Sequence, residues 1–236
     1  MSQSTNKTIA VVPAAGIGSR MGAEVPKQYL ALNEQTILGH TLDCLLSHAD
    51  ISQVIVALNP ADQHFALLPQ AQHPKLTTVV GGNERADSVL AALQLADENS
   101  WVLVHDAARP CLSHLDIDKL IASTTHFPQG AILGSPVRDT MKRTSENGEI
   151  ATTVCREQLW HALTPQYFNV QQLKQNLTQA LNAGVLITDE ASAMEWAGVR
   201  PGIISGRSDN IKVTHPDDLQ LASLFLTNLA SSINKA

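Results

Sequence analysis

The sequence has few cysteines, no long apolar run and no excess of basic residues. Its three cysteines, Cys44, Cys111 and Cys155, are widely spaced and form no C-x-x-C pair, which favours free thiols in a reducing cytoplasm over a disulfide framework or a zinc site. No stretch approaches the ~18 apolar residues of a membrane span, and the polar N-terminus lacks the pattern of a signal peptide. The net charge of −6 disfavours binding to nucleic acid or to anionic membranes. We therefore expect a cytoplasmic protein that binds neither nucleic acid nor membrane.

Several catalytic motifs are also absent. No Gly-Lys pair occurs, so there is no P-loop, and neither H-E-x-x-H nor G-x-S-x-G is present. The dinucleotide fingerprint G-x-G-x-x-G fails because Met21 occupies the position of its third glycine. It fails again at the end of the second expected strand, where Asn59 follows in place of an acid. These absences disfavour P-loop NTPases, zinc proteases of the H-E-x-x-H type, α/β-hydrolases and nicotinamide dehydrogenases.

A glycine-containing loop near the N-terminus is the most informative stretch that is present. Residues 8–12 form an apolar run that predicts a short buried strand, and small residues including Gly16 and Gly18 follow it. Such a turn can point free N–H groups at phosphate oxygens. Arg20 and Lys27 place two cations beside the turn. The combination favours a nucleoside triphosphate site, and a plain strand-to-helix turn is the structural alternative.

Strands and helices alternate along the first half of the chain. This rhythm predicts βαβ units in a doubly wound, mostly parallel Rossmann-like α/β sheet with helices on both faces. We expect one nucleotide-binding domain over residues 1–236. The predicted strands cover residues 8–12, 54–58, 76–80, 101–104 and 131–133, and the predicted helices cover residues 36–48, 84–96 and 115–122.

The pattern changes after residue 136. Residues 136–143 and 150–155 predict a β-hairpin around the turn pair Asn147-Gly148. We expect the arm at residues 136–157 to swap across a homodimer, and a surface excursion of a monomer is the alternative. Beyond it the sequence predicts a short strand and turn at 160–166, helices at 170–183 and from a Thr188 cap to 197, short strands at 203–204 and 210–213, and a last helix opening at 215–218.

Polar clusters follow several of the predicted strands, and parallel sheets bind ligands at these carboxyl ends. They are residues 81–83 with Arg85 and Ser88, residues 105–110, and Arg207 with Asp209 and Lys212. Each cluster alone also fits a turn or a surface ion pair. We expect His105 and His161 to be core histidines rather than catalytic bases.

These segments together resemble one family. The opening loop and Pro26-Lys27 match the A-G-x-G-x-R-M…P-K pattern of nucleotidyltransferases that activate sugars and alcohols. Residues 81–89, 104–110, 136–142, 188–192 and 209–212 extend the likeness to the 2-C-methyl-D-erythritol 4-phosphate cytidylyltransferase family, from about residue 8 to about residue 226. The resemblance implies a reaction in which CTP and 2-C-methyl-D-erythritol 4-phosphate give 4-diphosphocytidyl-2-C-methyl-D-erythritol and pyrophosphate, with Mg²⁺. A cytidylyltransferase for another polyol phosphate, such as ribitol 5-phosphate, and a non-catalytic nucleotide-sensing module are the alternatives.

The resemblance also implies a role for individual residues. Catalytic roles fall to Arg20, Lys27, Arg156 and Lys212. Pro13, Ala14, Ala15, Gly16 and Gly18 would wrap CTP, Gly82, Asn83 and Ser88 would read cytosine, and Asp106, Ala107 and Arg109 would contact ribose or the erythritol hydroxyls. Thr188 and Lys212 would hold the substrate phosphate, with Thr140 and Arg156 supplied by the partner's arm. Mg²⁺ would be held mainly by the triphosphate, with Asp106 and Asp209 as the nearby acids. Asn83 stands where the family carries an acid, so the Gly82 backbone is the alternative contact with the base.

Overall fold

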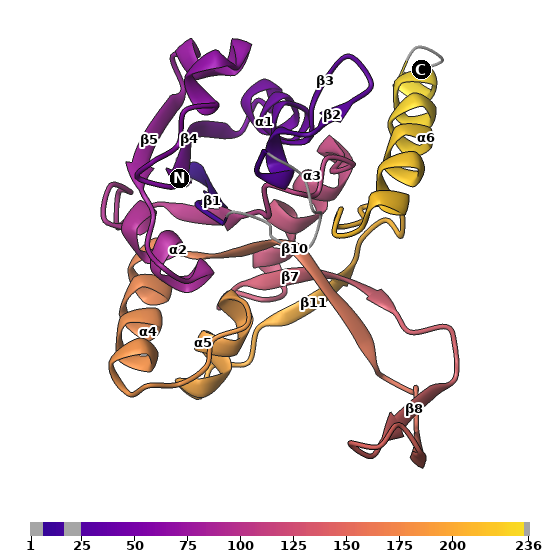
Figure 1. Cartoon of the computed structure of the whole chain (residues 1–236). Helices are drawn as coiled ribbons and strands as arrows, with labels where there is room; N and C mark the ends of the chain where they lie inside the picture. Colours follow the sequence, from indigo (N-terminus) through magenta and orange to yellow (C-terminus); the bar gives the residue numbers. More distant parts are fainter. Residues whose placement is uncertain (1–6, 17–24, 234–236) are drawn as a thin grey trace.

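A central seven-stranded sheet organises the computed structural model, which describes residues 7–16 and 25–233 (Figure 1). The strand order is β11-β7-β10-β6-β1-β4-β5. Neighbouring strands are parallel, except that β10 runs antiparallel to both β6 and β7. The bounds are β1 Thr8–Ala14, β4 Ile51–Leu58, β5 Leu76–Val80, β6 Trp101–Val104, β7 Ala131–Pro136, β10 Trp160–Asn169 and β11 Gly202–Ser205. The predicted doubly wound α/β sheet is confirmed.

Strand β10 is longer and more central than the sequence predicts. The expected short strand and turn at 160–166 is wrong, because the chain continues through a cis Thr164–Pro165 bond as one ten-residue strand. Its pairing with β7 shifts between Ala162 and Gln166. Residues 166–169 pair with β6, whereas residues 160–162, which follow the hairpin, pair with β7 alone. A Thr-Pro pair predicts a turn on local propensity alone, but here the paired residues before and after it keep it within one strand.

Two helical layers cover the sheet. Helices α1 (Ile37–Ser47) and α3 (His114–Ala122) pack on one face, and α2 (Arg85–Leu93), α4 (Val170–Asn182) and α5 (Glu190–Trp196) pack on the other. Strand β1 shows how the sequence serves both layers: Ala10 and Val12 join the first core, while Ile9 and Val11 join the second. Successive side chains of a strand point to opposite faces, so a continuous apolar run is what a doubly covered strand requires.

The C-terminal helix packs beside the loops that follow β6. Helix α6 (Pro216–Ile233) joins a third apolar cluster with Ile37, Ala108, Cys111 and Val213. The predicted strand at 210–213 is wrong, because this segment is an irregular loop. Its alternating apolar residues resemble a strand, but they pack under α6, and Val213 N donates to Ala108 O.

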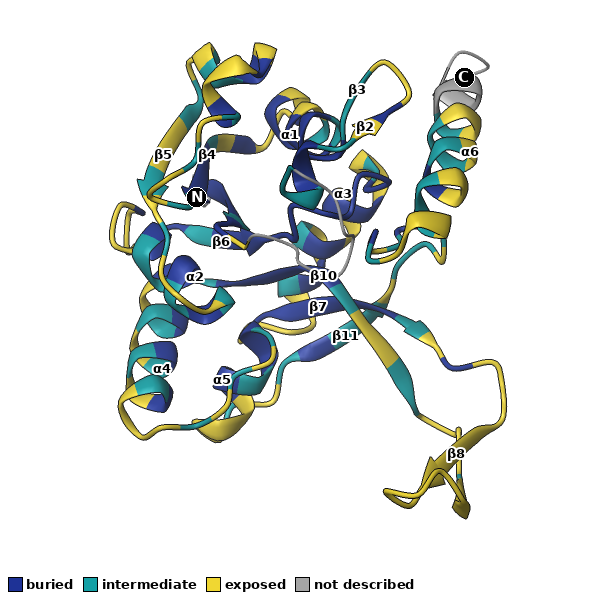
Figure 2. Ribbon diagram, viewed as in Figure 1, coloured by how far each residue is buried: buried dark blue, intermediate teal, exposed yellow. Residues whose placement is uncertain are grey.

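A hairpin projects from the sheet, as the sequence predicts (Figure 1). Strands β8 (Met141–Thr144) and β9 (Ile150–Val154) form a separate two-stranded sheet. Every residue of β8 and all but the last of β9 are exposed (Figure 2). A short two-residue pair, β2 (Ala31–Leu32) with β3 (Gln35–Thr36), leads into α1. No helix among the described residues is long and apolar enough to cross a membrane.

Candidate active site

A cavity of about 540 Å³ lies beyond the carboxyl ends of β1, β5 and β6. This is the position at which open parallel sheets bind ligands. Pro13 and Ala14 end β1, and Ala15 and Gly16 follow it. Residues 82–88 follow β5, and residues 106–108 follow β6. The cavity is lined by Pro13, Ala14, Ala15, Gly16, Lys27, Gln28, Gly82, Asn83, Glu84, Arg85, Ser88, Asp106, Ala107, Ala108, Lys212 and Thr214.

Most of the residues predicted for the site therefore meet at one cavity. Arg109 lies just behind it, buried against Asp106. Thr188 is exposed at the start of α5, and Thr140 and Arg156 lie on the exposed hairpin arm. These three do not line the cavity within this chain. Gly18 and Arg20 lie outside the described residues.

Gln28 holds the loop after β1, a role that the sequence did not reveal. Its buried side chain donates to Ala14 O at 2.8 Å and to Gly16 O at 3.1 Å. Two carbonyl groups of the loop are thereby turned toward Gln28. In the sequence, the position of Gln28 directly after the predicted catalytic Lys27 was the feature that could have indicated this role.

Lys27 opens a short 3-10 turn, Lys27–Tyr29, that follows Pro26. The side chain is half-buried at the cavity wall, and its Nζ donates to Val213 O at 3.3 Å. The ammonium group therefore bridges the start of the chain and the loop that carries Lys212.

The loop after β5 is closed by hydrogen bonds of its own. The Gly82 amide donates to Ser88 Oγ at 3.1 Å, and the Ser88 hydroxyl donates to Glu84 O at 3.2 Å. A Cβ at Gly82 would lie 2.3 Å from Asp87 Cβ, so no larger residue fits there without displacement. Helix α2 begins at this loop, and Glu84 and Asp87 form its capping box.

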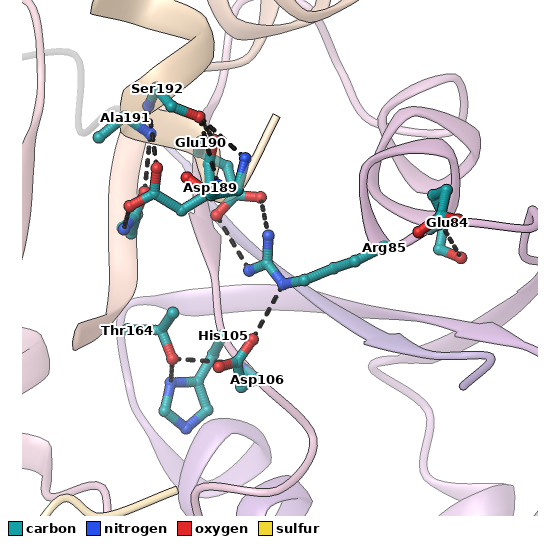
Figure 3. A network of polar contacts seen from close by, with 12 residues as sticks. Glu84, Arg85, His105, Asp106, Thr164, Asp189, Glu190, Ala191 and Ser192 are labelled. Carbon is teal, nitrogen blue, oxygen red and sulfur yellow. Dashed lines mark hydrogen bonds and ion pairs between the residues drawn. The ribbon is translucent and has the colours of Figure 1, made fainter. Parts of the chain in front are cut away.

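Asp106 is the centre of the charged groups at the cavity, and Figure 3 shows its contact with Arg85. Its Oδ1 lies 3.0 Å from Arg85 Nε, and its Oδ2 lies 2.9 Å from Lys212 Nζ and 3.4 Å from Arg109 Nε. Burial alone would raise the pKa of Asp106, but the positive charges of Arg85, Lys212 and Arg109 outweigh burial and hold the pKa well below its usual range. The carboxylate stays ionised and fixes Lys212 at the cavity wall.

His105 is connected to the backbone of Asp106 through a chain of hydrogen bonds. The Asp106 amide donates to Thr164 Oγ1 at 3.1 Å, and that hydroxyl donates to His105 Nδ1 at 3.1 Å. The other ring nitrogen, Nε2, donates to Arg109 O at 3.0 Å. This network assigns the neutral tautomer that carries its proton on Nε2. The side chain is fully buried, so the prediction of a core histidine is confirmed for His105 and wrong for His161, which is exposed.

The buried imidazole makes the fold sensitive to moderate acid. Burial lowers the pKa of His105 from 6.5 to about 4. In the unfolded chain the imidazole binds a proton below its ordinary pKa, so the unfolded state holds more protons between pH 6.5 and 4. We expect the free energy of unfolding to fall by about 3 kcal/mol as the pH drops through this window. Urea unfolding at closely spaced pH values measures it.

His105→Gln removes the titrating group, so its stability should change less with pH between 6.5 and 4 than that of the wild type. The matched control is His126→Gln, because His126 is exposed, and this variant should keep the wild-type slope. Equal slopes in His105→Gln and the wild type would contradict the assignment.

The start of α5 is held by Gln166 of β10. Gln166 is fully buried, and its side chain donates to Asp189 Oδ2 and accepts from the Ala191 amide, both at 2.8 Å. The predicted Thr188 cap is wrong: Asp189 is the N-cap and forms a capping box with Ser192. The cap brings Glu190 beside Arg85, where Arg85 Nη1 and Nη2 lie 2.6 and 3.1 Å from the Glu190 carboxylate oxygens.

A group of His48, Asp50 and Asp118 has the residue types of a metal site but lies elsewhere. His48 and Asp50 precede β4, at the opposite end of the strands from the cavity. His48 Nδ1 accepts from the Asp50 amide at 3.2 Å, and His48 Nε2 lies 3.1 Å from Asp118 Oδ1. A metal-bound imidazole uses its second nitrogen as a donor, whereas Nδ1 here faces a donor. The group is therefore a closed set of hydrogen bonds.

Comparisons with known proteins identify the family of the chain. The model of the family described as "IspD: 2-C-methyl-D-erythritol 4-phosphate cytidylyltransferase" matches residues 8–228. The protein of that name from Shewanella piezotolerans is 84% identical over 229 residues, which cover 97% of this chain and 99% of the relative. The crystal structure of the Francisella tularensis protein of that name has a TM-score of 0.79 at 33% identity and covers 93% of this chain and 99% of its own. A crystal structure of 4-diphosphocytidyl-2C-methyl-D-erythritol synthase has a TM-score of 0.80 at 36% identity and covers 94% and 99% of the two chains. The chain is a nucleotidyltransferase and belongs to the 2-C-methyl-D-erythritol 4-phosphate cytidylyltransferase family.

Proposed function

We propose that the chain transfers the cytidylyl group of CTP to 2-C-methyl-D-erythritol 4-phosphate in isoprenoid precursor synthesis. The observation that carries this proposal is the placement of Lys27 and Lys212 on one cavity wall, beyond the strand ends and beside a glycine loop. Two cations that line one cavity suit a reaction between two phosphorylated substrates.

The reaction itself needs positioning more than covalent help from the protein. An oxygen of the substrate phosphate attacks the α-phosphorus of CTP in line, and the bond from that phosphorus to the bridging oxygen breaks as pyrophosphate leaves. Lys27, together with Arg20, stabilises the charge that develops on the triphosphate. Lys212 and Thr188 hold the attacking phosphate.

The base and sugar would occupy the side of the cavity formed by the loops after β5 and β6. Because the Gly82 amide is already bonded to Ser88, we assign cytosine recognition to the Gly82 carbonyl oxygen and the Asn83 side chain. Asp106 and Ala107 face ribose or the erythritol hydroxyls. Arg109 acts from behind, since its Nη1 donates to Asn210 O at 2.7 Å and its Nε contacts Asp106.

Mg²⁺ is the cofactor that this reaction implies, and the two candidate acids do not suit it as ligands. Asp106 is surrounded by three cations, and Asp209 is ion-paired with Arg207. Neither carboxylate is available without breaking an ion pair. Mg²⁺ keeps several waters and binds readily through substrate phosphates, so we assign its coordination to the triphosphate and water, where it would neutralise phosphate charge.

A homodimer through the arm at residues 136–157 would complete the site. The arm buries almost none of its own side chains, and Ile150 is 66% exposed. An isolated two-stranded hairpin is at best marginally stable in water, so packing on a second copy would support it. That packing would bring Thr140 and Arg156 to the partner's cavity. The native protein should sediment with the mass of two chains, and a monomer at micromolar concentration would contradict the dimer.

A mixing experiment tests whether sites are shared between subunits. This proposal predicts that the Lys27→Ala and Arg156→Ala proteins are each nearly inactive. Each substitution removes a residue from a different part of a site that is built from two subunits. After unfolding and refolding together in equal amounts, the mixture should regain about a quarter of wild-type activity, because about half of the dimers are mixed and each of these has one intact site of two. No regain at any mixing ratio would place Arg156 in its own subunit's site or in none.

A pyrophosphate-release assay tests the function directly. The protein is given CTP, ATP, GTP or UTP with 2-C-methyl-D-erythritol 4-phosphate, and then CTP with ribitol 5-phosphate. We expect pyrophosphate release only when CTP is combined with 2-C-methyl-D-erythritol 4-phosphate. Preference for ribitol 5-phosphate would favour the other polyol, and no release with any pair would favour a nucleotide-binding module.

A further inference from the structure

Arg85 lines the cavity, yet each of its side-chain nitrogens contacts a protein carboxylate. Nη1 and Nη2 lie 2.6 and 3.1 Å from Oε1 and Oε2 of Glu190, and Nε lies 3.0 Å from Asp106 Oδ1 (Figure 3). The guanidinium therefore presents its fork to Glu190 and its remaining nitrogen to Asp106. Only one N–H group on each Nη remains outside these three contacts.

Glu190 lies behind the cavity and does not line it. Its side chain is only 2% exposed, and both of its oxygens accept from Arg85. Gln166 fixes the start of α5 through Asp189 and the Ala191 amide, so the backbone that carries Glu190 is held in place. The Glu190 carboxylate therefore influences the cavity through its contact with Arg85, which lines it.

Three cations share the Asp106 carboxylate, and the way they share it depends on Glu190. Arginine pairs with carboxylates most strongly when two of its N–H groups reach both oxygens, whereas lysine is a point charge. With its fork occupied by Glu190, Arg85 takes only Oδ1. Oδ2 remains with Lys212 at 2.9 Å.

We propose that Glu190 is a positioning residue for Lys212: by occupying the fork of Arg85, it keeps Arg85 from taking both oxygens of Asp106 and releasing the lysine. That Lys212 binds a phosphate rests on the proposed function. The contacts that join Glu190, Arg85, Asp106 and Lys212 are independent of that function. Because Glu190 and Arg85 come from α5 and α2, the pair also fixes the start of α2, which borders the cavity, relative to the start of α5.

Charge removal at Glu190 tests the proposal. Glu190→Gln keeps the shape of the side chain but frees the fork, so Arg85 turns to Asp106 and Lys212 detaches. Without the charge-assisted hydrogen bond from Lys212 to the phosphate, kcat/KM for 2-C-methyl-D-erythritol 4-phosphate should fall about 10- to 100-fold. The matched control is Glu195→Gln on the same helix, where Glu195 is exposed, and it should remain at the wild-type value.

The double variant Arg85→Gln/Glu190→Gln separates positioning from general stability. In the double variant residue 85 is neutral and no longer competes with Lys212 for Asp106, and the two amides can bond to each other. Its kcat/KM should recover to within about tenfold of the wild type, well above that of Glu190→Gln. A double variant that is no more active than Glu190→Gln would overturn the proposal. If Glu190→Gln unfolds at the assay temperature, the double variant is compared with the wild type alone, and a loss beyond about tenfold overturns it.

A second measurement keeps this proposal apart from the proposed function. Crystal structures of the wild type and the same variants report the distance from Lys212 Nζ to Asp106 Oδ2, which is 2.9 Å in the wild type. If the wild type turned over neither polyol phosphate, the function would fall, but a lysine that leaves Asp106 in Glu190→Gln and returns in the double variant would still support the positioning role. A Lys212 that stays on Asp106 in Glu190→Gln would overturn the positioning role, whether or not the wild type is active.

Discussion

Lys27→Ala should lower kcat by a factor of about 10²–10³ while the chain folds as before, the loss expected when one preorganised transition-state interaction is removed. Lys27 faces the cavity, and its hydrogen bond to Val213 O is long, at 3.3 Å. Because the charge on the triphosphate grows as the α-phosphorus is attacked, the attraction to Lys27 strengthens in the transition state. We therefore expect kcat and kcat/KM to fall by the same factor. Steady-state pyrophosphate release measures both.

The control for Lys27→Ala is Lys174→Ala. Lys174 pairs with Glu98 on the surface of α4, and an exposed ion pair of this kind contributes about 0–1 kcal/mol to stability and nothing to turnover. Urea unfolding should give both variants nearly wild-type stability. A rise in KM for CTP with kcat unchanged in Lys27→Ala would make Lys27 a binding residue that does not distinguish the transition state.

Asp106→Asn should destabilise the fold more than any other single charge removal at the site. The variant keeps the shape of the side chain but leaves Arg85, Arg109 and Lys212 around a neutral amide. Breaking a buried ion pair by removing one partner costs about 3–5 kcal/mol. Urea unfolding at pH 7 should show a loss of this size, and kcat/KM should fall with it because Lys212 loses its anchor.

The pH dependence of this loss provides a second check. The pKa of Asp106 is lowered in the folded state, so the carboxylate stabilises the fold above its ordinary pKa of 3.8 and loses that contribution as the pH falls below it. The stability of the wild type should therefore approach that of Asp106→Asn gradually as the pH falls from about 4 toward the lowered pKa of Asp106. Asp217→Asn, an exposed acid in the first turn of α6, should change stability by less than about 0.5 kcal/mol at any pH. A constant difference between Asp106→Asn and the wild type down to low pH would show that shape, not charge, matters at this position.

The sheet was largely predictable because its strands are short apolar runs bounded by turns. β5 and β6 have the predicted bounds, and α1 begins and ends one residue inside the predicted segment. The errors fall where local pattern and tertiary context conflict. The Thr164–Pro165 pair lies within β10 because the residues before and after it pair with β7. Residues 210–213 alternate like a strand although they pack under α6.

The cavity was predictable from one rule, whereas its charge network was not. Glycine loops and polar clusters after strands meet at one edge of any parallel sheet, which is why Gly16, Gly82 and Asp106 could be grouped from sequence. Arg85 and Glu190 are 105 residues apart, and each also fits a local role: a surface ion pair on a helix, or an acid near a helix start. Only the tertiary fold, which brings the starts of α2 and α5 together, pairs them.

The order of strands in the sheet also determines how the chain can form during synthesis. β1, β4, β5 and β6 lie within residues 8–104 and are neighbours in one half of the sheet, so they can assemble while the ribosome is still translating the rest. The edge of β6 then stays unpaired until β10 has been synthesised, and β10 follows the hairpin arm in the sequence. An unpaired strand edge invites association with other chains. We therefore expect nascent chains that end between β6 and β10 to be the form of this protein that most needs chaperone protection.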